Sequence, residues 1–158
     1  IKACFYEPYV SAARAGQPIH VFSADGAMHN VHPTPRVAGN SEANRAMLPN
    51  GAPVKFVFAQ PELFLRFKGD VHPWEYAYVS IFDHPFFAVT DKNGRFRFSQ
   101  PPAGSYELRF AHRKLPEAGV QLKVDRGSNL AVDAVLRSSA NGRGGPRVSV
   151  KRIGVDSN

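Results

Sequence analysis

Hydrophobic and polar residues alternate in short runs along most of this chain. Residues 53–59 place Val54, Phe56 and Phe58 on one side, and residues 62–68 alternate in the same way. A period of two is typical of a β-strand with one buried face. The pattern predicts strands over residues 9–13, 19–23, 53–59, 62–68, 76–82, 86–90, 95–99, 105–111, 119–124 and 129–136, with some strand character over 147–155.

Turn-forming residues separate these runs at intervals of about eight to twelve residues, the spacing of a β-sandwich or a barrel. Ala15-Gly16-Gln17-Pro18 is one such separator. Helical patterns are scarce: residues 41–47, with Ser41 as a cap, predict only a turn or two of helix. We therefore expect an all-β protein.

Two turn motifs organise the second half of the chain. Asp91-Lys92-Asn93-Gly94 ends in the Asn-Gly pair that tight hairpin turns favour, and Pro101-Pro102-Ala103-Gly104 follows it. Residues 138–146 have the Ser- and Gly-rich composition of a flexible linker. We expect a β-sandwich over 1–83, a β-meander over 84–137 with a soft boundary, and a linker with a basic arm over 138–158.

Composition narrows the functional classes. The 158 residues, 43% of them hydrophobic, suit one domain or two small ones. No apolar run approaches the roughly 18 residues that a membrane-spanning helix needs. The chain begins at Ile1 without a signal-like segment, so we expect a mature product or the ordered part of something longer. Although the net charge is +7, the basic residues are scattered and no recognition helix accompanies them, which argues against nucleic acid as a partner.

Basic side chains are instead candidates for contacts with an acidic protein or with anionic headgroups. Arg95 and Arg97 share one side of their predicted strand, while Phe96 and Phe98 point to the other. We expect the tail from Ser138 to be either a solvated terminus or an arm that adds a strand to a partner's sheet edge or docks on an acidic surface. The candidate partner-binding residues are Arg95, Arg97, Arg143, Arg147, Lys151 and Arg152.

Two runs place histidines where strand-like segments meet proline-rich loops. One is His29-Asn30-Val31-His32-Pro33, and the other covers residues 67–75 and includes His72 and Glu75. Single histidines in such places are commonly structural, but two runs favour a metal site more than one does. The lone Cys4 cannot form an internal disulfide, and we expect a buried, inert thiol or a pairing outside this segment.

Catalytic motifs are absent from the sequence. It contains no Gly-x-Ser-x-Gly elbow, and Ser80 lies inside an apolar strand. The glycines of residues 142–145 are not followed by a helical pattern, as a phosphate-binding loop requires. We therefore do not expect an enzyme.

Several ordered motifs occur along the chain. They are Cys4-Phe5-Tyr6-Glu7-Pro8, Ala15-Gly16-Gln17-Pro18, the run from His29, residues 68–74, His84-Pro85-Phe86-Phe87-Ala88-Val89-Thr90-Asp91 and Pro102-Ala103-Gly104-Ser105-Tyr106. Together they resemble a known family, the periplasmic cupredoxin-like proteins of bacteria grouped with methylamine utilisation, and this resemblance covers most of residues 3–137. Through Gly94-Arg95-Phe96-Arg97-Phe98 and Ser105-Tyr106-Glu107-Leu108, the residues after about 86 also resemble the transthyretin-like or carboxypeptidase-regulatory-like β module.

The cupredoxin-like resemblance implies a copper site that this chain has altered. The family's loop reads Cys-x-x-His-x-x-Met and supplies a thiolate, an imidazole and a thioether, with a distant second imidazole. By this resemblance His29 and His72 match the imidazole positions, whereas Gly69 replaces the cysteine and Glu75 the methionine. If relatives pair the Cys4 position with position 69, that disulfide is lost as well. We therefore expect a lost copper site and no cofactor.

The resemblance then implies a non-enzymatic periplasmic docking or structural subunit. Its expected partners are protein subunits of an electron-transfer or membrane-associated complex, respiratory or photosynthetic, that is membrane-embedded or contains cytochromes. The alternative is a copper-binding electron carrier or other metal-binding protein that uses His29, His72 and Glu75, with His32 or His84 as additions. A third hypothesis is a metal-dependent enzyme that uses the same ligands. Cys4 replaces the missing thiolate only if the fold brings it beside His72.

Overall fold

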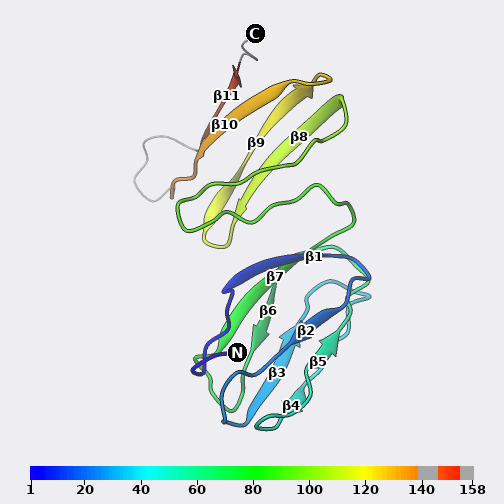
Figure 1. Ribbon diagram of the computed structural model, residues 1–158, viewed down its shortest axis with the longest axis vertical. Coiled ribbons are helices and arrows are strands. Elements are labelled where there is room, and N and C mark those ends of the chain that lie inside the picture. Colours follow the sequence, from blue (N-terminus) through cyan, green and yellow to red (C-terminus); the bar gives the residue numbers. More distant parts are fainter. Residues whose placement is uncertain (139–145, 154–158) are drawn as a thin grey trace. The chain divides into compact units, whose positions relative to one another are not determined.

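All regular elements among residues 1–138 and 146–153, which the computed structural model describes, are strands (Figure 1). The all-β prediction is confirmed, and no helix in these residues has the length and apolar character to cross a membrane. The strands are β1 (Val10–Arg14), β2 (Ile19–Val21), β3 (His29–Thr34), β4 (Arg45–Met47), β5 (Val54–Phe56), β6 (Glu62–Lys68), β7 (Tyr76–Phe82), β8 (Gly104–His112), β9 (Leu115–Val124), β10 (Asn129–Val135) and β11 (Arg147–Ile153).

The chain divides into two compact units, residues 1–98 and 99–158. In the first unit a five-stranded sheet has the order β1-β7-β6-β3-β4, and β2 pairs with β5 in a separate ribbon. β1 runs parallel to β7, while the other pairs of the first unit are antiparallel. The first unit thus extends beyond residue 84, where the sequence placed a soft boundary.

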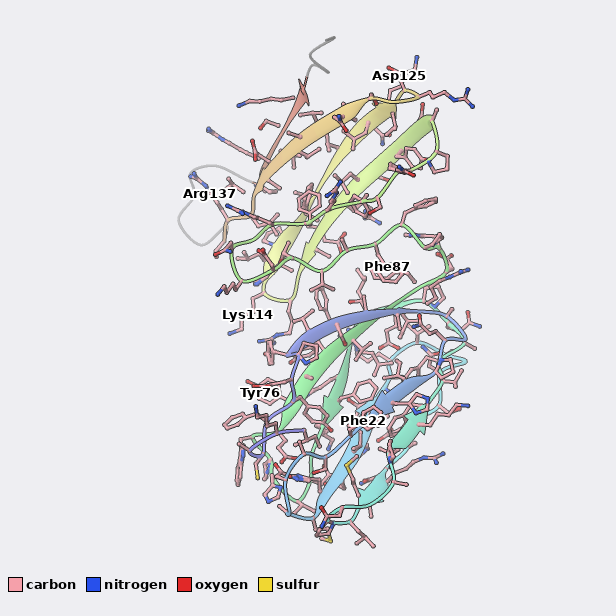
Figure 2. All side chains as sticks on the ribbon, viewed as in Figure 1. Phe22, Tyr76, Phe87, Lys114, Asp125 and Arg137 are labelled. Atoms are coloured by element: carbon pink, nitrogen blue, oxygen red, sulfur yellow. The ribbon has the colours of Figure 1, made fainter. Side chains whose placement is uncertain are left out.

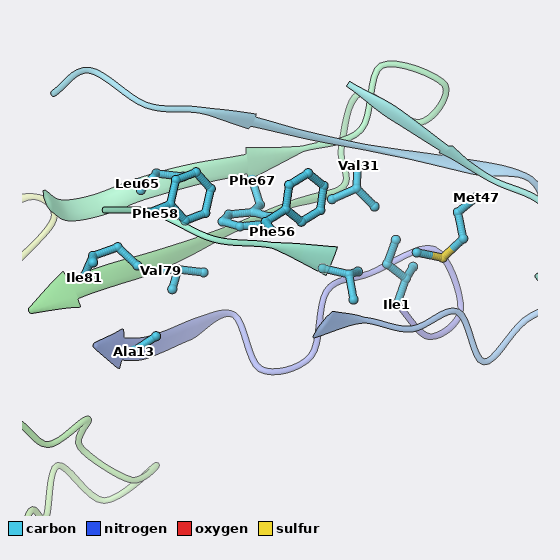
Figure 3. Packing of buried hydrophobic residues seen from close by; sticks show 11 residues of the cluster. Ile1, Ala13, Val31, Met47, Phe56, Phe58, Leu65, Phe67, Val79 and Ile81 are labelled. Carbon is cyan, nitrogen blue, oxygen red and sulfur yellow. The ribbon is translucent and has the colours of Figure 1, made fainter. Parts of the chain in front are cut away.

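The core of the first unit lies between the five-stranded sheet and the β2–β5 ribbon (Figure 3). Phe56 of β5 and Phe58 just after it meet Phe67 of β6 edge to face, with ring centroids 5.6 and 5.9 Å away. Val21 faces the same interior from β2. Two layers that share one buried apolar interior make a β-sandwich, so this prediction is confirmed.

Sequence periodicity misplaced four segments. Residues 29–34 and 45–47 form β3 and β4, although the first carries polar residues and a proline and the second was expected to be helical. Residues 86–90 and 95–99 were predicted to be strands, but no described strand covers them. Alternation favours an extended backbone, whereas a strand also requires a partner for its hydrogen bonds. The turn between the last two segments is present, since Gly94 N–H donates to Asp91 O at 2.9 Å.

Within its described residues the second unit contains two antiparallel strand pairs. β8 and β9 form a long hairpin in which Tyr106 lies opposite Leu122 and Leu108 opposite Val120. Lys114 lies in the turn of this hairpin, and Asp125 follows β9 (Figure 2). The transthyretin-like resemblance of this unit stays a prediction.

The basic arm forms a strand within its own chain. β11 pairs with β10 from Asn129↔Ile153 to Val135↔Arg147. Arg147, Lys151 and Arg152 therefore lie on a strand that pairs with β10 of the same chain, and contact of this arm with a partner stays a prediction. Arg143 lies outside the described residues.

Candidate metal centre

Four side chains with metal-binding atoms converge in the first unit. One ligand atom from each of Cys4, His29, His72 and Glu75 lies within 4.8 Å of the others. The structure thus brings together the three residues of the alternative metal-binding hypothesis and adds a thiol to them. The two further histidines considered, His32 and His84, lie outside this cluster.

Three separate segments supply the cluster. His29 is the first residue of β3, where it pairs opposite Met47 of β4. His72 and Glu75 lie in the loop between β6 and β7, which is closed by hydrogen bonds from Gly69 N–H to Glu75 O at 2.8 Å and from Glu75 N–H to His72 O at 2.9 Å. Cys4 comes from a turn near the start of the chain.

The turn that carries Cys4 has an unusual backbone. Lys2 and Phe5 exchange two hydrogen bonds of 2.8 and 3.0 Å, and Ala3 and Cys4 between them both have positive φ, 49° and 58°. Residues other than glycine rarely adopt this conformation, and it persists where surrounding contacts hold it. The Asp25 carboxylate supplies such a contact by accepting the Cys4 N–H at 3.0 Å.

Asp25 also contacts a histidine of the cluster. Its Oδ1 lies 2.5 Å from His29 Nε2 and accepts the Ser23 hydroxyl at 2.9 Å. The Cys4 N–H first, and His29 second, hold the pKa of Asp25 well below its usual range. One ionised carboxylate therefore connects the backbone that bears the thiol to the first imidazole.

Glu75 is completely buried at the centre of the cluster. Its Oε1 lies 2.8 Å from His29 Nδ1 and 3.2 Å from His72 Nδ1, and the side chains of Glu75 and His29 are 0% exposed. The imidazoles of His29 and His72 thus both direct their Nδ1 atoms toward Glu75 Oε1. Neither lysine nor arginine forms an ion pair with Glu75 among the residues that the structure describes.

Several buried polar atoms around this point lack a hydrogen-bond partner within the described part of the chain. They are Glu75 Oε2, His72 Nδ1 and the hydroxyl of Tyr6. Burial, and then the charge of Glu75, raise the pKa of Tyr6, so this hydroxyl keeps its proton. Unpartnered buried polar atoms are rare and costly. A cation bound among these donors would give Glu75 Oε2 and His72 Nδ1 a partner.

The absence of a side chain at Gly69 makes room for Glu75. A Cβ built on Gly69 would lie 2.8 Å from Glu75 Oε2 and 3.1 Å from the His72 carbonyl oxygen. The Glu75 carboxylate therefore fills the space that a side chain at position 69 would need.

A second polar network holds the β6–β7 loop on β3. Asn30 Oδ1 accepts the N–H groups of Asp70 and Val71 at 2.7 and 2.9 Å. His32 lies 2.7 Å from Asp70 Oδ2 and 2.6 Å from Glu42 Oε1 through its two ring nitrogens. His32 thus anchors the loop that carries His72 from outside the cluster.

Two groups of this network have altered acidity. Lys68 first, and His32 second, lower the pKa of Asp70. Burial alone would lower the pKa of His32, but hydrogen bonds to Glu42 and Asp70 outweigh it, and the pKa is raised. His84 is engaged elsewhere, since its Nδ1 accepts the Phe86 N–H at 3.2 Å.

Sequence reasoning considered Cys4 only as a conditional replacement for the missing thiolate, and it missed Asp25 and Tyr6 as neighbours of the cluster. Cys4 and Tyr6 lie in a segment that matched the resembling family, but no spacing rule links them to residues 69–75. Asp25 belongs to no motif. The sequence offered one chemical signal for Cys4: a chain with two histidine runs also contains a single cysteine, and a cysteine can supply the thiolate that these runs lack.

The candidate partner-binding arginines of the first unit are exposed. Arg95 and Arg97 alternate with the half-buried Phe96 and Phe98, whose rings meet edge to face at 5.9 Å. The predicted separation of basic and aromatic sides is thus present without a strand.

Comparisons with known proteins gave a distant structural similarity. No family model matches the sequence, and no curated protein matches it. Solved structures similar to this chain include two amicyanin mutants in the reduced state, each 18% identical, and an oxidised amicyanin mutant, 17% identical. Each covers 51% of this chain and 76% of the amicyanin chain, with a TM-score of 0.45.

Proposed function

We propose that this protein binds one copper ion through Cys4, His29, His72 and Glu75. A single observation carries the proposal: three separate segments bring a thiol, two imidazoles and a buried carboxylate within 4.8 Å of one another. Two imidazoles and a thiolate are the donors that copper centres of electron-transfer proteins use. From the sequence we expected a lost site because position 69 holds no thiolate, with Cys4 as a replacement only if the fold brings it beside His72.

The donors fit a transition metal better than a structural hydrogen-bond network. Glu75 Oε2 and His72 Nδ1 remain without hydrogen-bond partners in the described chain, although both are buried. The basic groups beside the Glu75 carboxylate are the two imidazoles, which carry charge only when protonated, and a buried carboxylate is costly because its charge has left water. A bound cation would give both Glu75 Oε2 and His72 Nδ1 a coordination partner.

The residues of the chain prepare this site before any ion binds. Asp25 holds the Cys4 turn and contacts the far nitrogen of His29, so that His29 Nδ1 faces the centre. Such contacts to the second ring nitrogen orient ligating histidines in metal proteins. Bound copper would supply one-electron redox chemistry.

A copper titration tests the proposal. We expect the purified protein to bind one equivalent of Cu(II) and to develop an absorption band from thiolate-to-copper charge transfer. Cys4→Ser should abolish this band, and His29→Ala should abolish stoichiometric binding. His84→Ala is the matched control, because this exposed histidine lies outside the cluster. If no stoichiometric copper binds, or if Cys4→Ser keeps the band, the proposal is wrong.

A docking role in a larger periplasmic assembly remains a separate proposal. The exposed pair Arg95 and Arg97 supports it, because an acidic partner would meet two guanidinium groups on one side of the segment. Metal binding and docking are compatible, since the arginines do not belong to the metal cluster.

A further inference from the structure

We propose that this centre binds divalent ions in preference to Cu(I), an inference that rests on the proposed function. Two of the four ligands, the Cys4 thiolate and the Glu75 carboxylate, bind a metal as anions. The imidazoles of His29 and His72 bind as neutral ligands. A divalent ion cancels the two negative charges, whereas Cu(I) leaves one of them uncompensated.

The burial of the centre makes an uncompensated charge expensive. The side chains of His29 and Glu75 are 0% exposed, and that of His72 is 20% exposed. Charges removed from water interact strongly and lose their hydration. The difference between a divalent and a monovalent ion is therefore larger here than it would be at an exposed site.

Asp25 increases this preference. Its carboxylate adds a third negative charge beside the cluster, 2.5 Å from His29 Nε2. Within the described ranges, the ion pairs of Asp25 and Glu75 involve only histidines and neither lysine nor arginine. With a divalent ion in place the two ligand charges are balanced and only Asp25 remains. With Cu(I) a second negative charge remains as well.

The chemical hardness of the fourth ligand acts in the same direction. Thiolates and thioethers favour Cu(I), whereas carboxylate oxygens favour harder ions. The Glu75 carboxylate fits in the cluster because residue 69 is a glycine: a Cβ on Gly69 would lie 2.8 Å from Glu75 Oε2. Charge and hardness together assign the centre to Cu(II) or Zn(II).

The test compares the affinities of one protein for three ions. Cu(II), Zn(II) and, without oxygen, Cu(I) are titrated against chelators of known affinity. We expect the wild-type protein to bind Cu(II) more tightly than Cu(I), and Glu75→Gln to lower the ratio of these affinities about 10- to 100-fold. Glu62→Gln is the matched control, because Glu62 is also buried but accepts N–H groups from Arg36 and Val37 instead.

The outcomes separate this inference from the proposed function. Cu(I) binding as tight as or tighter than Cu(II) in the wild-type protein overturns the inference and leaves the metal site standing. An unchanged ratio in folded Glu75→Gln also overturns it. Absence of binding by all three ions overturns both proposals. The wild-type ratio needs no variant, so the test does not depend on whether Glu75→Gln folds.

Discussion

Gly69 and Glu75 form a complementary pair, because the Glu75 carboxylate fills the space that a side chain at position 69 would need. A Cβ on Gly69 would lie 2.8 Å from Glu75 Oε2, 3.1 Å from the His72 carbonyl oxygen and 3.3 Å from Glu75 Cβ. Two of these neighbours belong to the backbone or lie close to it, so they have little freedom to move away.

We therefore expect Gly69→Ala to destabilise the protein by about 1–3 kcal/mol, the usual cost of overpacking. Urea denaturation measures this change. The penalty should be smaller on a Glu75→Ala background, because the Oε2 contact is then removed. Gly26→Ala is the control, since a Cβ there meets nothing within 4 Å. Equal penalties on both backgrounds would show that Gly69 and Glu75 are not coupled.

Asp25 is expected to act as a positioning residue for two ligands. Asp25→Ala removes the acceptor of the Cys4 N–H and the contact to His29 Nε2, and we expect metal affinity to fall about 10- to 100-fold. Chelator competition measures the affinity, and circular dichroism checks that the sheet persists. Ser23→Ala removes a hydroxyl that donates to the Asp25 carboxylate and accepts the Asp25 N–H, but it leaves the carboxylate that contacts Cys4 and His29, so its effect should be smaller. Unchanged affinity in folded Asp25→Ala would contradict this role.

Cys4 should be a poor nucleophile in the metal-free protein. Burial, followed by the charges of Asp25 and Glu75, raises the pKa of Cys4, so the reactive thiolate is scarce at neutral pH. The rate of alkylation by iodoacetamide should therefore keep rising with pH beyond the ordinary cysteine pKa of about 8.5. Mass spectrometry measures the rate. Asp25→Asn removes one of the charges and should shift the profile to lower pH; a profile already flat at pH 8 would disprove the prediction.

His32 should make stability depend on pH. The raised pKa means that the folded protein holds this proton more tightly than the unfolded chain does. The stabilisation is therefore fully present below the unfolded value of about 6.5 and is lost as the pH rises through the folded value. The stability difference between wild type and His32→Gln should be larger at pH 5.5 than at pH 9 in urea denaturation. A difference that grows with pH would contradict the prediction.

Docking through the basic surface predicts a dependence on charge and on salt. Reversing Arg95 and Arg97 to glutamate should weaken capture of an acidic partner, and added salt should weaken wild-type capture in the same way. The control is the pair Arg109→Glu and Arg113→Glu in the second unit, which changes the net charge equally. Equal losses in both pairs would indicate a nonspecific effect of net charge.

The sequence by itself determined the strands whose alternation is regular. β6 and β7 have the predicted bounds, Glu62–Lys68 and Tyr76–Phe82, because each places apolar residues on a face that must leave water. The alternation pattern did not predict β3, because both of its faces are largely buried and the strand contains polar residues. Its polar residues are explained only by their partners in the folded protein.

The sequence also named His29, His72 and Glu75 as the members of a possible site, through their residue types and the resemblance. Only the tertiary structure decided that Cys4 joins them, since a turn at the start of the chain lies within 4.8 Å of residues far along it. Local spacing carries information about side chains on one loop or strand. Contacts between distant segments depend on how whole sheets pack, and here that packing supplies the sulfur that position 69 lacks.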